Sequence, residues 1–121
     1  MRTGLLLILL AFAAPLSAQV RESDGYVRVN SRADIERTPR GTQMVRAQTL
    51  PEADLPALTR FENIGCLDLR CNQALTDKGL NALRALPAGV RFDFRGCRGL
   101  STSSLVAFAG WSGNKPDRMV H

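Results

Sequence analysis

Histidine is nearly absent from this chain, and lysine and aromatic residues are scarce. The single histidine is His121, the last residue, and only Lys78 and Lys115 are lysines. A catalytic histidine must be held in place, which is not expected of a terminal residue. Aromatic residues make up 6% of the chain, so few rings are available for bases of single-stranded nucleic acid to stack on. The formal charge of +5 comes almost wholly from arginines interleaved with acids, and no nucleic-acid partner is expected.

Motifs for the common catalytic and cofactor sites are also missing from the sequence. The chain has no glycine-rich phosphate loop, no serine–histidine–aspartate set and no metalloprotease helix motif. Zinc takes four protein ligands in structural sites, and three cysteines with a terminal histidine are a weak set. We therefore expect no cofactor, no bound metal and no enzymatic activity.

The apolar run at the N-terminus is short. It extends over Leu5–Leu16, follows a positive Arg2 and leads to the small residue Ala18. A helix that spans a bilayer needs about 20 apolar residues, more than this run provides. The pattern predicts a signal peptide over residues 1–18, and hence a secreted or periplasmic protein without a stable membrane span after cleavage. An uncleaved N-terminal membrane tether is the alternative.

A repeat with a period of about 25 residues organises the rest of the chain. The segment Leu67-Asp68-Leu69 is matched one period later by Phe92-Asp93-Phe94 and one period earlier by Thr42-Gln43-Met44. In each copy an alternating apolar pair predicts a strand with one buried face, and apolar residues three apart predict a helix after it. One such unit cannot bury its own apolar face, so the units must stack. We predict an α/β fold with three copies over residues 41–111.

The middle copy, residues 64–83, closely resembles the cysteine-containing class of leucine-rich repeats. That class has Asn or Cys three residues after the strand motif, then Leu-Thr-Asp-x-Gly-Leu. Asn72 and Cys97 stand at the Asn/Cys position, and residues 75–80 match the second motif throughout. The resemblance weakens in the first copy, where Ala47 takes the Asn/Cys position. It implies a short solenoid with parallel strands on the concave face and helices on the convex face.

The two flanks of the repeats are expected to differ. Residues 26–29 alternate as a strand does, and Ser31 can cap a short helix after it. We predict that residues 19–40 form a capping strand and turn at the N-terminal end. At the other end Trp111 is expected to fold over the last apolar layer, and residues 112–121 to form a mobile polar tail.

Three cysteines allow at most one disulfide within the chain. Cys71 and Cys97 are predicted to be diagonal neighbours in adjacent copies, within reach of each other. Cys66 and Cys71 would lie about 16 Å apart along an extended strand and cannot pair. A Cys71–Cys97 disulfide and buried or free thiols both stay open.

The strand face that points away from the core is the predicted binding surface. Besides Gln43, Val45 and Cys66, five charged residues are expected there: Asp68, Arg70, Arg91, Asp93 and Arg95.

Asp68 and Asp93 would lie about 4.8 Å apart on neighbouring strands, where one carboxylate could raise the pKa of the other. The flanking arginines instead favour a solvated charge ladder. We predict an exported, non-catalytic module that binds a protein or peptide on its concave face. The alternative is a structural or envelope-associated protein whose basic surface contacts anionic lipid or polymer.

Overall fold

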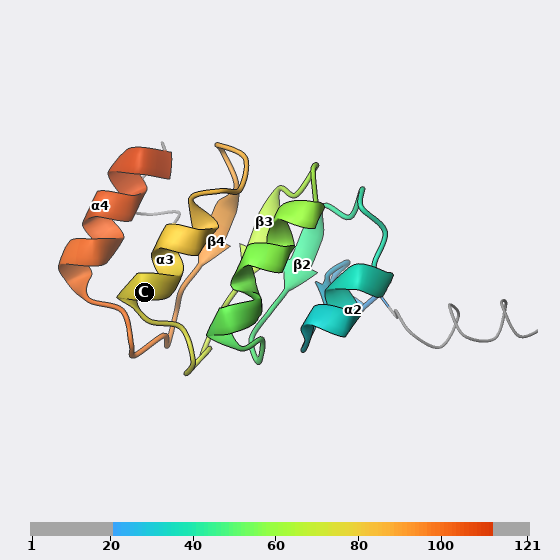
Figure 1. Ribbon diagram of the computed structural model, residues 1–121, viewed down its shortest axis with the longest axis horizontal. Coiled ribbons are helices and arrows are strands. Elements are labelled where there is room, and N and C mark those ends of the chain that lie inside the picture. The colour runs from blue at the N-terminus through green and yellow to red at the C-terminus, as the bar shows by residue number, and fades with distance from the viewer. Residues whose placement is uncertain (1–20, 113–121) are drawn as a thin grey trace, which may run out of the picture.

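The computed structural model describes residues 21–112; the predicted signal peptide and the predicted tail beyond Ser112 lie outside the described residues. Four strands form one parallel sheet in chain order: β1 (Val27–Arg28), β2 (Met44–Arg46), β3 (Cys66–Asp68) and β4 (Arg91–Asp93). Each strand is followed by a helix: α2 (Arg32–Arg37), the 3₁₀ helix η1 (Glu52–Arg60), α3 (Asp77–Leu83) and α4 (Thr102–Ser112). The helices form a layer on one side of the sheet (Figure 1). The predicted α/β class is confirmed.

The predicted period holds for only one of the two pairs of neighbouring strands to which it was applied. Leu67 pairs with Phe92, at the predicted period, but Val45 pairs with Leu67, which is three positions short of it. The prediction that residues 42–44 match residues 67–69 is therefore wrong. Residues 47–51 join β2 to η1, whereas the longer segment 69–76 joins β3 to α3. The three missing residues lie between β2 and η1. The helices η1 and α3 therefore keep the full period, whereas the strands β2 and β3 do not.

This shift moves two side chains of the first copy into the core. Val45, expected on the outward strand face, is fully buried, as is Ala47. The backbone N–H of Leu50 donates to the carbonyl of Ala47, as that of Asn72 does to Leu69. Leu50, not Ala47, therefore stands at the position that Asn72 takes in the next copy.

Asn72 joins its own copy to the one before it. Its amide nitrogen donates to the carbonyls of Ala47 at 2.8 Å and Leu50 at 3.1 Å. Its amide oxygen accepts from the N–H groups of Ala74 at 2.9 Å and Leu75 at 3.1 Å. The side chain is buried, so its four hydrogen bonds replace those that water would make to these backbone groups.

The helix starts are stabilised both locally and by the preceding helix. Ser31 caps α2 as predicted, accepting from the N–H of Asp34. At the start of α3, Thr76 instead donates its N–H and hydroxyl to Glu52 of η1, at 2.7 and 2.6 Å. These hydrogen bonds from Thr76 hold the pKa of Glu52 below its ordinary value. One copy further on, Ser101 makes the equivalent two bonds to Asp77.

The core lies between the sheet and the helix layer. Leu69 is fully buried, as predicted, in the middle of this layer. At the C-terminal end the rings of Phe92, Phe94 and Phe108 contact one another, with centroids 5.0 to 5.9 Å apart. Trp111 packs against Phe108 with ring centroids 5.2 Å apart, so it covers the last apolar layer as predicted.

Candidate functional site

The outer face, defined here as the sheet face that points away from the helices, carries a row of charges. The register places Arg28, Arg46, Asp68 and Asp93 in line across the four strands. Side chains alternate along a strand, so these four point away from the core-facing row of Val27, Val45, Leu67 and Phe92. In this row Arg46 and Asp68 place opposite charges on neighbouring strands, an arrangement that favours a hydrogen-bonded ion pair.

Each aspartate of this row is bound by the arginine two residues after it. Asp68 accepts from the backbone N–H of Arg70 at 3.0 Å, and from its Nε and Nη2 at 3.0 and 2.9 Å. Asp93 accepts in the same way from Arg95, at 3.2, 3.0 and 2.7 Å. Such two-pronged pairs hold both the guanidinium and the carboxylate in fixed orientations.

Arg46 is an outer-face residue that was not predicted from the sequence. Its Nε donates to Asp68 at 2.6 Å, its Nη2 donates to Asp24 at 2.6 Å, and its Nη1 binds Glu22. The guanidinium carbon also lies 4.6 Å from the centre of the Tyr26 ring. The shortened strand period aligns Arg46 with Asp68, whereas the period assumed from the sequence did not.

Asp68 is buried, which contradicts the prediction of a solvated charge ladder. Its side chain is 3% exposed, whereas those of Asp93 and Arg95 are 25% and 53% exposed. Burial by itself raises the pKa of Asp68, but hydrogen bonds from Arg70 and Arg46 outweigh it and leave the pKa below its ordinary value.

The alternative in which one carboxylate raises the pKa of the other is not borne out for Asp68, whose pKa is lowered. Each of the two aspartates is bound by its own arginine, and Arg70 Nε also lies 3.7 Å from an oxygen of Asp93. A guanidinium therefore contacts both carboxylates. The hydrogen bonds from Arg70 and Arg46 keep the pKa of Asp68 below its ordinary value, which opposes proton uptake by this carboxyl group.

The N-terminal segment covers part of the outer face. Arg21 pairs with Val27 in an antiparallel bridge, and the intervening segment brings Glu22 and Asp24 onto Arg46. The two arginines of the β1–β2 half, Arg28 and Arg46, are thus paired with acidic residues of this segment. We call the other half the β3–β4 surface; it comprises Cys66, Arg70, Arg91, Asp93 and Arg95.

Four of the five predicted site residues lie on this β3–β4 surface. Arg91 is exposed, and its side chain makes no hydrogen bond or ion pair with any other residue of the part that the structure describes. Arg95 uses Nε and Nη2 to bind Asp93, which leaves Nη1 without a partner among residues 21–112. Asp68 lies beneath these residues and orients Arg70.

The three cysteines are free thiols, so the Cys71–Cys97 disulfide is not formed in the structure. Cys97 is buried, and its thiol donates to the carbonyl of Leu69 at 2.9 Å. Burial raises the pKa of Cys97, which disfavours the reactive thiolate. Cys71 is exposed, with a left-handed backbone (φ 59°), and its side chain lies over Gly96, so the two side chains occupy different environments.

No family model, curated protein or solved structure matches the chain. The resemblance to leucine-rich repeats therefore stays a prediction. Within residues 21–112, no group of three or more histidine, cysteine or acidic side chains could hold a metal ion. No helix in the described part of the chain is long and apolar enough to cross a membrane.

Asp68→Asn is expected to lower the free energy of unfolding by about 1–2 kcal/mol near pH 6, because charge-assisted hydrogen bonds to a buried carboxylate are lost. The folded-state pKa of Asp68 lies below the ordinary value of 3.8, so its contribution is present above pH 3.8 and disappears as pH falls through the folded pKa. Urea unfolding of both proteins from pH 6 to pH 2.5 measures this difference.

Asp93→Asn is the matched control, because Asp93 binds its arginine in the same way but is more exposed. Its effect near pH 6 should be smaller than that of Asp68→Asn. A difference between wild type and Asp68→Asn that does not shrink in acid would contradict the role given to the ionised carboxylate.

Proposed function

We propose that the chain is an exported, non-catalytic module that binds a protein or peptide on the β3–β4 surface. We further propose that its repeated strand–helix units form a short leucine-rich repeat solenoid. In support, Asn72 and Cys97 both bond to backbone carbonyls of the preceding copy. In that architecture the β3–β4 surface belongs to the concave face.

One observation carries the binding proposal: the β3–β4 surface combines rigidly held arginines with donors that have no partner within the described residues. Asp93 fixes the orientation of Arg95, and Asp68 fixes that of Arg70. A guanidinium that is already oriented loses less side-chain entropy when it binds a partner's carboxylate. Arg91 and the free Nη1 of Arg95 supply the donors for such a carboxylate.

The size of the free surface favours a peptide or a single loop as the partner. On β1 and β2, Arg28 and Arg46 are paired with acidic residues of the N-terminal segment, so the unpaired arginine donors of the outer face lie on the β3–β4 surface. Two short strands present less area than the roughly 800 Å² per partner of a standard protein interface. An extended acidic segment would match Arg91 and Arg95 in charge.

Arg91→Glu/Arg95→Glu is expected to weaken partner binding at least tenfold, or about 1.4 kcal/mol, because attraction to a carboxylate becomes repulsion. The partner is first captured with the full-length chain as bait, and its affinity for both proteins is then measured by calorimetry. Both arginines are exposed, so the variant should keep the circular dichroism spectrum of the wild type.

Lys78→Glu/Arg84→Glu is the matched control, since it changes the charge equally at exposed residues at or next to α3. This control should bind the partner with nearly wild-type affinity. Equal weakening of both variants, with strong sensitivity to salt, would instead favour a basic surface that contacts anionic lipid or polymer.

A further inference from the structure

A second candidate site lies in the helix layer, between α2 and η1. A pocket of about 270 Å³ opens there, with the apolar side chains of Ile35 and Ala57 in its lining. Ile35 is fully buried beneath the pocket, so the accessible apolar surface there comes from the half-buried Ala57. The volume lies just below the roughly 300–1,000 Å³ of pockets that hold whole small molecules, so it fits a small ligand or one end group of a larger one.

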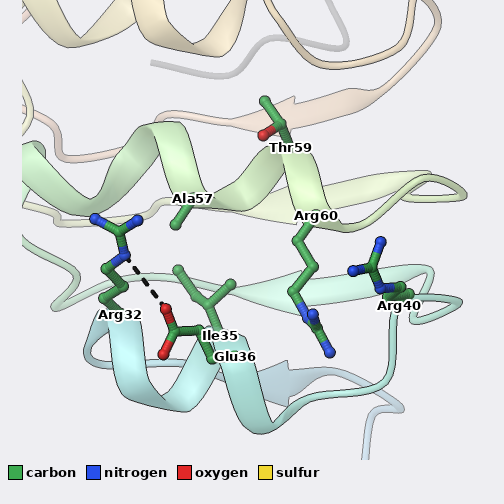
Figure 2. Close-up of a pocket in the computed structure, with 7 residues that line it drawn as sticks. All are labelled: Arg32, Ile35, Glu36, Arg40, Ala57, Thr59 and Arg60. Atoms are coloured by element: carbon green, nitrogen blue, oxygen red, sulfur yellow. Dashed lines mark ion pairs between the residues drawn. The ribbon is translucent and has the colours of Figure 1, made fainter.

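Three arginines and one glutamate surround this apolar lining. Arg40 and Arg60 lie at one end of the pocket, and Arg32 and Glu36 lie at the other (Figure 2). Arg32 Nε is 3.4 Å from Glu36, so these two charges offset each other at their end of the pocket.

Arg40 and Arg60 keep hydrogen-bond donors for a ligand. Arg60 Nε donates to the carbonyl of Thr38 at 3.3 Å, which holds the side chain in place but uses only one of its five N–H groups. Arg40 forms an ion pair with Glu62, but its Nη1 is 3.8 Å from the carboxylate, too far for a hydrogen bond. A bound anion would be attracted by both guanidinium groups, of which that of Arg40 is already partly neutralised by Glu62.

We propose that this pocket binds a phosphate ester, with the phosphate between Arg40 and Arg60 and a small apolar portion against Ala57. Guanidinium forks bind phosphate oxygens bidentately, and a group with up to two negative charges suits two arginines better than a single carboxylate does. The site lies in the helix layer and is separate from the β3–β4 surface. The phosphate comes either from a soluble ester or from a lipid headgroup.

The first test measures binding of glycerol 3-phosphate to the full-length chain by calorimetry at low salt. Arg40→Gln/Arg60→Gln should weaken binding at least tenfold. Ala57→Leu should weaken it comparably, because the larger side chain fills the pocket without changing any charge. Arg84→Gln/Arg98→Gln loses the same two charges at exposed residues outside the pocket, and should change the affinity less than twofold.

The second test measures binding to phosphatidylcholine vesicles with and without phosphatidic acid. Vesicles of phosphatidylcholine alone report any attachment through the apolar N-terminal run. Binding that needs phosphatidic acid and is lost in Arg40→Gln/Arg60→Gln, without binding of glycerol 3-phosphate, would assign the lipid headgroup as the source. Binding of glycerol 3-phosphate that is lost in the same variant would assign a soluble ester. No binding in either test, or equal weakening by the Arg84/Arg98 control, would overturn the proposal.

Discussion

Replacing Asn72 with alanine is expected to lower the free energy of unfolding by about 3–5 kcal/mol. The change removes four hydrogen bonds from a buried side chain. It leaves the carbonyl of Leu50 and the N–H groups of Ala74 and Leu75 without their Asn72 partner. A buried polar group without a partner costs about 1–3 kcal/mol, and one water entering the space left by the amide would make about three hydrogen bonds, not all four. Urea unfolding followed by circular dichroism measures the loss.

Asn72→Cys and Gln73→Ala are informative companions to this variant. Cysteine occurs at the equivalent position 97, where its thiol donates to a carbonyl of the preceding copy. Asn72→Cys should therefore recover part of the stability lost in Asn72→Ala. Gln73 is exposed and makes only long bonds to Cys71 and Gly96, so Gln73→Ala should change stability by less than about 0.5 kcal/mol. If Asn72→Ala were as stable as Gln73→Ala, the bonds from Asn72 would contribute no net stability.

The sequence predicted the middle and last copies well because periodicity reports directly on burial. Apolar alternation placed Leu67 and Leu69 on the core side, and the change to a spacing of three marked α3. The first copy could not be aligned in this way, since the helix residues keep the full period and conceal the shorter loop after β2. Pro56 in η1 is a local sign of irregularity, since proline lacks the N–H that an α-helix needs in its interior.

The charges of the outer face were predicted in part. Their side of the sheet follows from alternation along β3 and β4. The burial of Asp68 does not, because it depends on Arg46 from another strand, which in turn is bound by Glu22 and Asp24 from the N-terminal segment. Contacts between Glu22 and Arg46 carry no periodic signal in the sequence. The pocket at Arg40 and Arg60 was missed for the same reason, since α2 and η1 come together only in the folded chain.

Leu69→Ala is expected to lower the free energy of unfolding by about 2–5 kcal/mol. Leu69 is fully buried, and its backbone N–H pairs with the carbonyl of Asp93. Loss of three carbons there creates a cavity between neighbouring copies that the surrounding core cannot fill without moving the sheet or the helices. A small core supplies little excess stability, so this variant should be largely unfolded at physiological temperature. Val106→Ala is the control, because Val106 is exposed on α4 and its truncation should leave stability within about 0.5 kcal/mol of the wild type. Equal melting of the two variants would mean that Leu69 does not occupy the central layer of the core.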